Sequence, residues 1–410
     1  MDRSQACAQV AWRRTVDEHR AAVLALAPAP TPETIGLDSA LGRVLASQVS
    51  SRVDMPGWTN SAMDGFAVRF DDLSPGVRLP VTGDLPAGHP GGLELPPGVA
   101  MRIMTGAPLP GGADTVVPVE LTDIPRGPVP LPAAMTVHEL PERGGAVRER
   151  GEDAALGSVV APAGARLDAL TRGVIAAVGV AEVAVWRTPT VTAVATGDEV
   201  LELGTEPSAG QLVDCNSWLV HGLAAAAGNP AERCTLGHDD ADRLRAALPE
   251  LTAGTDLLVF TGGVSAGAYE VVRQALTPLG VEFGEVAMQP GKPQGLGRIG
   301  DTTVLCLPGN PVSAVVSFLA FGLPWLDAAS GRPARRPVQA TVADGWHKKP
   351  GREQFMPVVL NPDRTVGRRS PEGSGSHFVT RLAGVHGFAR IPAAVGRVEP
   401  GTQVEVMMVP

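Results

Sequence analysis

Three short loops combine glycine with acidic, hydroxyl or amide side chains, and each follows a predicted strand. They are Thr196–Glu199, Thr261–Gly267 and Pro308–Ser313. Glycine lets the backbone come close to a ligand, and a helix that begins after such a loop presents unpaired N–H groups that attract an anion. Because an open parallel sheet binds ligands at the carboxyl ends of its strands, the loops predict a site for a phosphorylated or otherwise anionic ligand. Any one of them alone could be an ordinary turn between a strand and a helix.

Within these loops, we select the residues that would contact the ligand: Thr196, Gly197, Asp198 and Glu199, then Gly262, Gly263 and Ser265, then Pro308, Gly309 and Asn310. Asp239 and Asp240 precede a predicted helix, where they could cap its N-terminus or join the site. Lys292 lies in a rigid Pro-Gly-Lys-Pro segment, where it could contact a phosphate or lie in a solvated turn. A dinucleotide site of the Rossmann type is not favoured, because no G-x-G-x-x-G pattern follows the first strand.

Three segments nearer the N-terminus are also dense in polar groups, namely Pro56–Phe66, Met104–Asp114 and Arg148–Asp153. Asn, Ser and Asp in such segments commonly satisfy the backbone of tight turns. Their composition alone therefore does not separate ligand binding from turn formation.

The region from 186 to about 330 alternates apolar strands with helices, which predicts a mainly parallel α/β sheet. The predicted strands are Thr190–Ala195, Asp256–Phe260 and Thr303–Leu307, and the predicted helices are Ser217–Ala227, Ala241–Leu248, Tyr269–Leu276 and Val312–Phe321. Short β-type runs separated by Pro and Gly occupy 51–144 and resume after Pro333, which predicts two smaller β-rich parts. Further helices are predicted at Val16–Leu26, at Leu37–Val49, where the helix leads into a strand, and at Ala169–Val178, the last with Asp168 as its cap.

The overall composition excludes several classes of protein. The chain of 410 residues has a net charge of −9 and no run rich in Lys and Arg, so no nucleic-acid-binding face is expected. Cys7, Cys215, Cys234 and Cys306 lack the spacing of a disulfide framework or a zinc site, which favours a reducing compartment. The N-terminus lacks a signal-peptide pattern, and no apolar run reaches roughly 18 residues. We therefore expect a soluble cytoplasmic protein.

Seven segments, in order along most of the chain, resemble the motifs of the MoeA/gephyrin family of molybdopterin molybdenumtransferases. They read S-A-M-D-G-F-A at Ser61–Ala67, I-M-T-G-A-P-L-P-G-G-A-D at Ile103–Asp114, R-E-R-G-E-D at Arg148–Asp153, T-G-D-E at Thr196–Glu199, G-G-V-S-A-G at Gly262–Gly267, P-G-K-P at Pro290–Pro293 and L-P-G-N-P-V-S at Leu307–Ser313. One match could be chance, but seven in family order identify the chain as similar to this family.

The resemblance implies a multidomain α/β protein with a central, mainly parallel sheet, an inserted β domain and a C-terminal β-barrel. The implied domains are a split helical linking domain at 1–50 and 145–185, an inserted β-rich domain at 51–144, an α/β molybdopterin-binding domain at 186–330 and a β-barrel domain at 331–410. It also implies a homodimer, in which each active site forms between the α/β domain of one subunit and the inserted domain of the other.

The resemblance further implies an enzyme that inserts molybdate into adenylated molybdopterin and releases AMP, with Mg²⁺ as its cofactor. The implied catalytic carboxylates are Asp153, Glu199, Asp239 and Glu270. Glu199 and Asp239 are the expected Mg²⁺ ligands, because carboxylates can hold this ion against a pyrophosphate. The other implied contacts to the substrate are Ser61, Asp64, Thr105, Lys292, Arg352 and Ser376.

Five positions depart from the family pattern, namely Thr59, Ala268, Glu285, Gln289 and Pro357. The family has acidic residues at the first two positions and basic residues at the other three. Losing cations weakens an anion site, since charge-assisted contacts contribute roughly 1.5–3 kcal/mol each. The alternative function is therefore a catalytically impaired paralogue. Such a paralogue would act as a dimeric scaffold that binds a protein partner near the last domain, or as a molybdopterin carrier.

Overall fold

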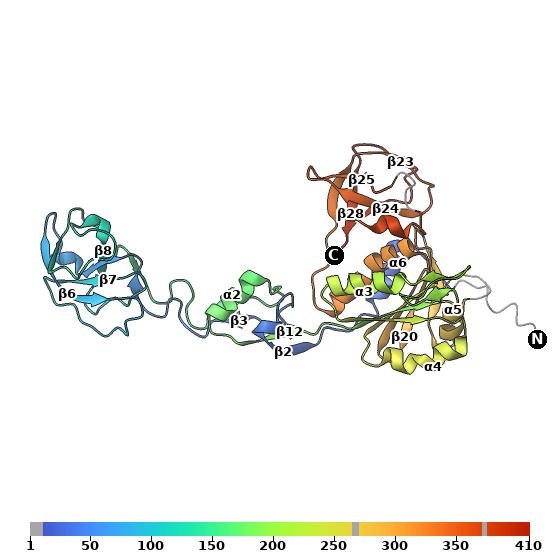
Figure 1. Cartoon of the computed structure of the whole chain (residues 1–410), viewed down its shortest axis with the longest axis horizontal. Coiled ribbons are helices and arrows are strands. Elements are labelled where there is room, and N and C mark those ends of the chain that lie inside the picture. Colours follow the sequence, from blue (N-terminus) through green and yellow to red (C-terminus); the bar gives the residue numbers. More distant parts are fainter. Residues whose placement is uncertain (1–10, 265–269, 371–374) are drawn as a thin grey trace, which may run out of the picture. The chain divides into compact units, whose positions relative to one another are not determined.

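The computed structural model describes residues 11–264, 270–370 and 375–410. Cys7, Ser265 and Ala268, which were considered above, lie outside these described residues. The chain forms two compact units (Figure 1). The first unit contains Met1–Glu33, Gly42–Val44 and Trp186–Pro410, and the second contains Thr34–Leu41 and Leu45–Val185.

The first unit is built on a mixed β-sheet. Its strands lie in the order β1 (Arg13–Arg14), β18 (Glu282–Val286), β20 (Pro293–Ile299), β21 (Thr302–Leu307), β17 (Leu257–Thr261), β13 (Val191–Thr196) and β16 (Ala231–Leu236). Strands β21, β17, β13 and β16 pair in parallel, whereas β20 runs antiparallel to both of its neighbours. The predicted α/β class is therefore confirmed, with a sheet that is parallel through its centre.

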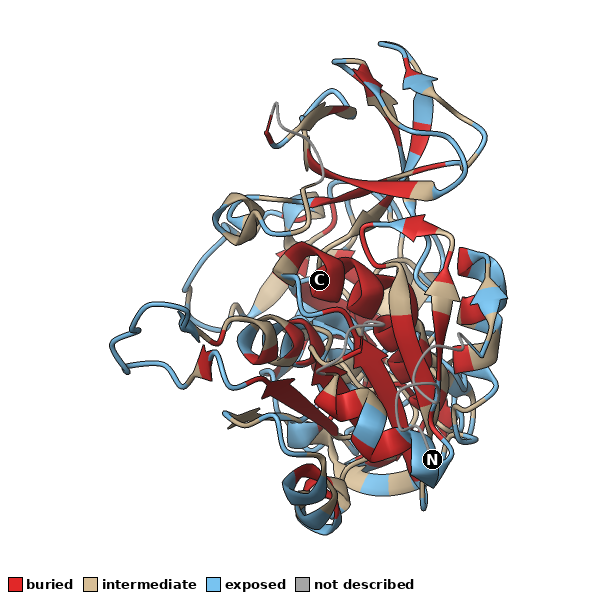
Figure 2. Cartoon of the chain, turned by 90° about the vertical axis from the view of Figure 1, so that its right-hand side faces the viewer, coloured by how far each residue is buried: buried red, intermediate tan, exposed pale blue. Residues whose placement is uncertain are grey.

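Helices cover both faces of this sheet. They are α1 (Val16–Leu24), α3 (Asn216–Ala226), α4 (Ala241–Thr252), α5 (Val271–Leu276), α6 (Pro311–Ser317) and α7 (Leu323–Ala329). Successive residues of a strand point to opposite faces, so Val259 and Phe260 of β17 enter two different apolar cores. The core around Val259 contains residues of α1, α3, α6 and α7, and the core around Phe260 contains residues of α4 and α5. Figure 2 shows the buried central strands between these helices.

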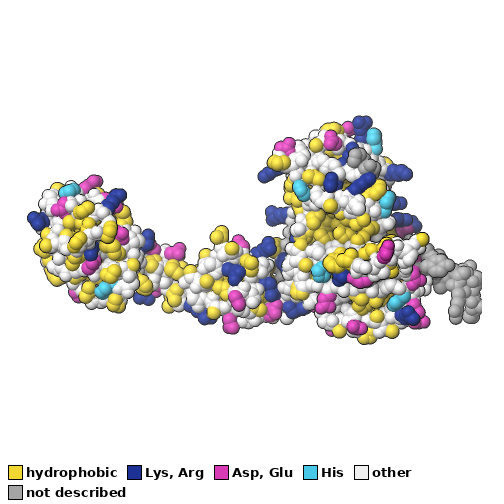
Figure 3. Space-filling view, viewed as in Figure 1, with side chains coloured by type: hydrophobic (Ala, Val, Ile, Leu, Met, Phe, Trp, Pro, Cys, Tyr) yellow, Lys and Arg dark blue, Asp and Glu magenta, His cyan; other side chains and the backbone are white. Residues whose placement is uncertain are grey.

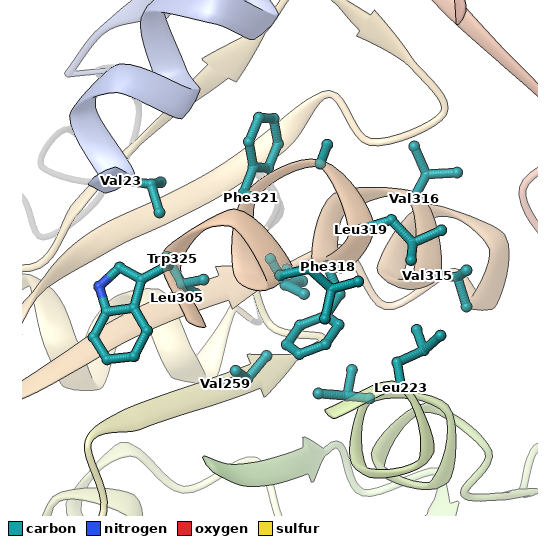
Figure 4. Packing of buried hydrophobic residues seen from close by; sticks show 14 of the residues in the cluster. Val23, Leu223, Val259, Leu305, Val315, Val316, Phe318, Leu319, Phe321 and Trp325 are labelled. Atoms are coloured by element: carbon teal, nitrogen blue, oxygen red, sulfur yellow. The ribbon is translucent and has the colours of Figure 1, made fainter. Parts of the chain in front are cut away.

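Helices α6 and α7 belong to one continuous helix, Pro311–Ala329, joined by a π-helical segment and packed in the first of these cores (Figure 4). The predicted helix Val312–Phe321 is therefore too short. Pro324 removes one backbone N–H from the helix, and the carbonyl of Ala320, four residues earlier, accepts a hydrogen bond from Arg20 Nε at 3.1 Å instead. The prediction that no apolar segment is long enough to span a membrane is also wrong for this helix. However, 89% of its most apolar window is buried inside the protein, as in the core helix of a soluble protein.

The C-terminal part of the first unit is a β-barrel, as predicted. Its strands are β22 (Val338–Val342), β24 (Glu353–Leu360), β25 (Thr365–Arg368), β26 (Gly387–Ile391) and β28 (Gln403–Met408). Strand β24 pairs with both β25 and β26, so the order β24–β25–β22–β28–β26 closes on itself. A short strand, β19 (Met288–Gln289), also pairs with β24 and attaches the barrel to the sheet. Two further short pairs in this unit are β14 (Val200–Leu201) with β15 (Leu212–Val213) and β23 (Trp346–His347) with β27 (Arg397–Val398).

The second unit contains an antiparallel-rich sheet in the order β8 (Thr115–Pro118), β5 (Gly65–Val68), β7 (Ala100–Ile103), β6 (Arg78–Leu85) and β9 (Ala134–Thr136). Shorter strands pair as β10 (Val147–Arg148) with β4 (Asn60–Ser61), β11 (Val159–Ala161) with β3 (Val49–Ser50), and β12 (Glu182–Trp186) with β2 (Pro32–Gly36). Its one described α-helix is α2 (Ala169–Ala177), and Asp168 caps this helix by accepting the Thr171 N–H at 2.8 Å, as predicted.

The predicted helix Leu37–Val49 is wrong. Only a single 3₁₀ turn forms, at Leu37–Ser39, and strand β3 follows. Two features end the helical conformation early. The Asp38 carboxylate accepts the backbone N–H of Ser39 at 2.9 Å, and Gly42 adopts a φ of +81°, which breaks a helix.

A buried histidine in the first unit gives the protein an acid-sensitive stability. His19 of α1 stacks on Trp12, with ring centroids 4.8 Å apart, and meets the edge of Phe321 at 4.6 Å. Burial, followed by the positive charge of Arg14, lowers the pKa of His19 from 6.5 to about 3. Between these two pH values the unfolded chain binds a proton that the native protein does not bind. The free energy of unfolding therefore falls as the pH drops below 6.5.

We expect the contribution of His19 to lower the free energy of unfolding by about 2 kcal/mol at pH 5 relative to pH 7. His19→Leu should remove this part of the pH dependence while keeping an apolar contact with Phe321. The measurement is urea unfolding of both proteins at the two pH values, with the exposed His347→Leu as a control that leaves the pH dependence unchanged. Equal pH dependence in the wild type and His19→Leu would contradict a neutral native His19.

Candidate functional site

The glycine-containing loops meet at one edge of the central sheet. Residues 196–199 lie at the end of β13, 262–264 follow β17, 308–310 follow β21, and 237–239 follow β16. These four strands are parallel neighbours, so their carboxyl ends lie together. Lys292 directly precedes β20, which runs antiparallel to β21, and so it reaches the same edge.

These segments line a cavity of about 820 Å³. Its charged lining consists of the acids Glu199, Asp239 and Glu270 and the cations Lys292 and Arg352. The other predicted residues in the lining are Thr196, Gly197, Gly262, Gly263, Pro308, Gly309, Asn310 and Ser376. The cavity is formed within the first unit, and it combines a glycine-rich backbone with charges of both signs.

Three of the loops touch one another through glycine. A Cβ on Gly262, whose φ is +98°, would lie 3.0 Å from the carbonyl oxygen of Thr196. A Cβ on Gly309 would lie 3.3 Å from the Cα of Gly262. The Gly262 N–H also donates to the carbonyl of Leu307 at 3.1 Å. The ends of β13, β17 and β21 can therefore approach this closely because two of the contacting residues have no side chain.

Gly262→Ala is expected to destabilise the protein by about 1–3 kcal/mol, because alanine rarely adopts this φ and its Cβ presses on Thr196. It should also weaken ligand binding, since the loops must separate. Gly254→Ala is the matched control, with a φ of +70° and nothing within 4 Å of the added Cβ. The measurements are the free energy of unfolding and the binding of the ligand. Equal loss of ligand binding in both variants would mean that the glycine contact does not shape the cavity.

The acidic residues that follow β16 have different roles. Asp240 is the N-cap of α4, and its carboxylate accepts the N–H groups of Asp242 and Arg243 at 2.9 and 3.0 Å. Asp239 lines the cavity, and its own N–H donates to Asp198 Oδ1 at 2.8 Å. The capping alternative therefore applies to Asp240. Asp198 is not part of the lining, and its side chain instead connects the loop after β13 to the loop after β16.

A loop of the barrel closes the cavity on another side. Ser376 accepts a hydrogen bond at its Oγ from Asn310 Nδ2 at 3.1 Å, and its carbonyl accepts the N–H of Val312 at 3.1 Å. Asn216 of α3 donates from Nδ2 to the carbonyl of Gly309 at 2.7 Å. These bonds hold the loop after β21 between α3 and the barrel, which orients the start of the helix Pro311–Ala329 toward the cavity.

Lys292 enters the cavity wall already paired. Its Nζ lies 2.8 Å from Glu285 Oε1, and this ion pair is the main reason why the pKa of Glu285 lies below its ordinary value. The turn before Lys292 is held by Gln294, which donates from Nε2 to the carbonyl of Gly291 at 2.7 Å and to Ser317 Oγ at 2.8 Å. The buried Gln294 and Ser317 thus position the Pro-Gly-Lys-Pro turn, a role that the sequence alone did not indicate.

One buried hydroxyl in the lining has no protein partner. Thr196 is 5% exposed, and its Oγ1 makes no hydrogen bond within the part of the chain that the structure describes. A buried polar atom without a partner is costly, so such atoms commonly find one in water or a ligand. Its position in the lining is consistent with the selection of Thr196 as a ligand contact.

The acids of the cavity do not form a complete metal cage. Across residues 11–264, 270–370 and 375–410, no group of three or more His, Cys, Asp and Glu side chains is placed to hold a metal ion. Glu199 and Asp239 line the same cavity as a pair of carboxylates. Two carboxylates suit Mg²⁺, which proteins usually hold with one or two such groups while substrate phosphates and water complete its shell.

The remaining predicted residues belong to the second unit. Asp64 accepts hydrogen bonds at Oδ1 from the Thr105 N–H at 2.7 Å and from its hydroxyl at 2.8 Å. Ser61 is fully buried, and its hydroxyl donates to the carbonyl of Met63. Asp153 lies on an exposed turn, where its N–H donates to the carbonyl of Met55 at 3.0 Å. Asp64 and Thr105 therefore form one local group, whereas Ser61 and Asp153 are held by separate backbone contacts.

Several lining residues were not selected from the sequence, among them the polar Ser313 and His377. Ser313 is buried in the first turn of α6, and His377 follows Ser376 in the barrel loop. Both lie within or next to motifs already quoted, at Leu307–Ser313 and around Ser376, so proximity to a motif was the available signal. Both residues reach the cavity only because of the helix that starts at Pro311 and the packing of the barrel loop.

Family models match the chain in three consecutive stretches. "MoeA N-terminal region (domain I and II)" matches residues 14–179, "Probable molybdopterin binding domain" matches 192–328, and "MoeA C-terminal region (domain IV)" matches 339–409. Together these models cover well over half of the chain.

Individual relatives are similar over nearly the full length. Molybdopterin molybdenumtransferase 2 of Mycobacterium tuberculosis is 39% identical over 408 residues, which cover 96% of this chain and 99% of that protein. The molybdopterin molybdenumtransferase of Haemophilus influenzae is 32% identical over 399 residues, which cover 96% and 98%. Among solved structures, a molybdopterin biosynthesis MoeA protein from Pyrococcus horikosii matches with a TM-score of 0.83 and 28% identity, covering 97% of this chain and 100% of that one.

Proposed function

Because this chain belongs to the MoeA family of molybdopterin molybdenumtransferases, which act in molybdenum-cofactor biosynthesis, we propose that its cavity binds adenylated molybdopterin and molybdate. The proposed reaction inserts molybdate into the dithiolene of the pterin and releases AMP. The observation that carries this proposal is the convergence of three glycine-containing loops with Glu199 and Asp239 on one cavity at the carboxyl ends of parallel strands.

The anionic parts of the substrate are assigned to the backbone and cations of the cavity. The loops after β17 and β21 bring Gly263 and Gly309 to the lining, and the helix Pro311–Ala329 begins there with its positive end. Arg352 and Lys292, the latter paired with Glu285, are the cations of the lining. These groups suit a pyrophosphate, because it offers several oxygen acceptors to N–H donors.

The carboxylates are assigned to the cleavage of the pyrophosphate. Glu199, Asp239 and Glu270 line the cavity, where a carboxylate can orient a water molecule and accept its proton. Glu199 and Asp239 are the residues that would hold Mg²⁺. When bound, this ion would neutralise charge that develops on the phosphate oxygens.

We also assign to the chain a homodimeric state, a cytoplasmic location, and roles for Ser61, Asp64, Thr105 and Asp153 of the second unit in the same reaction. The support is the family membership and the hydrogen-bonded pair of Asp64 and Thr105. Light scattering after size-exclusion chromatography tests the dimer. A mass of one chain, 42.3 kDa, at assay concentrations would contradict it.

The function is tested with the purified full chain, adenylated molybdopterin, molybdate and Mg²⁺. AMP release and molybdenum in the pterin product are measured together over several turnovers. Molybdate-dependent AMP release by the wild type is the expected result. If the folded protein releases no AMP, the proposed enzymatic function is overturned and the scaffold or carrier function remains.

An apolar groove favours the scaffold as the second candidate. A cavity of about 670 Å³ lies between α7 and β28, with Leu319, Leu323 and Met407 in its lining. Its lining also contains Arg335, which is ion-paired with Asp327 at 2.7 Å. Figure 3 shows hydrophobic side chains gathered beneath the barrel, next to the C-terminal strand. Such a groove suits an apolar segment of a partner. Partner binding that is lost in Leu323→Glu, combined with no AMP release by the wild type, would establish this candidate.

A further inference from the structure

Glu285 sits beside the cavity without being part of its lining. It belongs to β18, where it pairs with Pro293 of β20, so its side chain lies next to Lys292. Its Oε1 is 2.8 Å from Lys292 Nζ, and its Oε2 is 3.5 Å from Arg13 Nε. Three cations act on this carboxylate, because Lys292, Arg13 and Arg352 all contribute to the lowering of its pKa.

The ion pair changes the charge that the cavity presents. The described lining carries three acids and two cations, and Glu285 neutralises one of these cations, Lys292. Arg352 forms no ion pair among the described residues and is the cation still available to a ligand. The cavity as it stands is therefore poor in free positive charge, although the proposed ligand carries a pyrophosphate.

The ion pair is exchangeable. The side chains of Lys292 and Glu285 are 42% and 26% exposed, and ion pairs that contact water are weak because solvent and salt compete with them. Arg13 lies close enough to remain with Glu285 when Lys292 leaves. A multiply charged anion can therefore replace Glu285 as the partner of Lys292.

The ion pair is also not needed to shape the turn. The N–H of Val286 donates to the carbonyl of Lys292 at 2.8 Å, and Gln294 and Ser317 hold Gly291 from within the core. The backbone around Lys292 is thus fixed by bonds that do not involve the Glu285 side chain. Removing the charge of Glu285 should leave the turn in place.

We propose that Glu285 is a specificity-determining residue, which occupies Lys292 in the free protein and yields it only to an anionic group of high charge density. This inference rests on the proposed function for the identity of the ligand, and it deepens that function. Glu285 competes with weakly charged ligands for Lys292, whereas a pyrophosphate displaces it. The acid thus raises the charge that a ligand needs in order to bind.

The test is a double-mutant cycle of Glu285→Gln and Lys292→Gln, read as dissociation constants from isothermal titration calorimetry. The full chain is titrated with inorganic pyrophosphate and, separately, with adenylated molybdopterin. Glu285→Gln should tighten binding by about fivefold, and Lys292→Gln should weaken it by about tenfold. The double variant should bind like Lys292→Gln, because Glu285 acts through Lys292. Glu282→Gln, an exposed acid on the same strand, should change neither constant.

Each outcome separates the two proposals. Three results for pyrophosphate would overturn the role of Glu285. They are unchanged binding in Glu285→Gln, no detectable binding in any variant, and a Glu285→Gln substitution that tightens binding equally whether residue 292 is lysine or glutamine. If adenylated molybdopterin binds no variant while the pyrophosphate cycle behaves as expected, the proposed function fails and the role of Glu285 stands. Titration with orthophosphate measures the specificity. The ratio of the orthophosphate dissociation constant to the pyrophosphate dissociation constant should be smaller for Glu285→Gln than for the wild type.

Discussion

Replacing Glu199 by glutamine is expected to slow AMP release by about a hundredfold or more, the loss typical of removing a catalytic proton acceptor. Glu199 lines the cavity at the end of β13, and its carboxylate packs over Gly197, where a Cβ would meet Glu199 Oε2 at 2.4 Å. Glutamine keeps this shape but loses the charge, both as a proton acceptor and as one of the two residues assigned to Mg²⁺. The measurement is the initial rate of AMP release at saturating adenylated molybdopterin and molybdate.

The matched control for this variant is Glu206→Gln. Glu206 is an exposed acid further along the same segment and is not part of the cavity lining, so its variant should keep the wild-type rate. Titration with Mg²⁺ separates the two roles of Glu199, because a lost metal ligand raises the Mg²⁺ concentration needed for half-maximal rate. A Glu199→Gln protein with the wild-type rate at all Mg²⁺ concentrations would remove Glu199 from the catalytic residues.

The second large effect is expected in the core, where Phe318→Ala should lower the stability of the first unit by about 3–5 kcal/mol. Phe318 is fully buried in the helix Pro311–Ala329, and it packs among residues of the central sheet and of α3, including Val259 and Leu223 (Figure 4). Alanine leaves a cavity because these neighbours are held by strands and helices that cannot collapse onto it. The same position supports the loop after β21, so ligand binding should weaken with stability.

Hydrogen exchange read by mass spectrometry measures this effect for each unit separately. Peptides that contain β17 and β21 should exchange faster in Phe318→Ala, whereas peptides from β5 and β7 of the second unit should be unchanged. Leu203→Ala, at a side chain that is 61% exposed in the first unit, is the control and should alter the stability by less than about 0.5 kcal/mol. Uniformly faster exchange in both units would show that Phe318 stabilises more than the core that contains it.

Several elements of the fold could be predicted because their signals are local. The cap of α2 depends on Asp168 and on the N–H of Thr171, three residues away. Strands β13, β17 and β21 are runs of apolar residues that a buried sheet requires, and they were predicted to within one residue at each end. The glycine-containing loops come directly after these strands in the sequence. Placing them at one edge required only the rule that parallel strands end together.

The errors arise where distant residues decide the local structure. The helix after β21 continues past Pro324 by way of a π-helical segment, in which the carbonyl of Ala320 accepts a hydrogen bond from Arg20, 300 positions earlier. The Asp198 carboxylate likewise accepts a hydrogen bond from the N–H of Asp239, which lies 41 positions later. Neither hydrophobic periodicity nor helix propensity reveals hydrogen-bond partners that lie far apart in the sequence.

The sequence by itself determined which residues form the strands, which loops carry glycine, and which acids stand at the strand ends, because these properties depend on neighbours within a few positions. Only the tertiary structure decided which charges remain available in the cavity. From the sequence, Glu285 is interpreted as a position where a cation of the family pattern is missing. In the fold it is the ion-pair partner of Lys292, because antiparallel pairing brings β18 beside β20. The physical reason is that the interaction of two charges depends on their separation and their exposure to water. Both are properties of the packed chain.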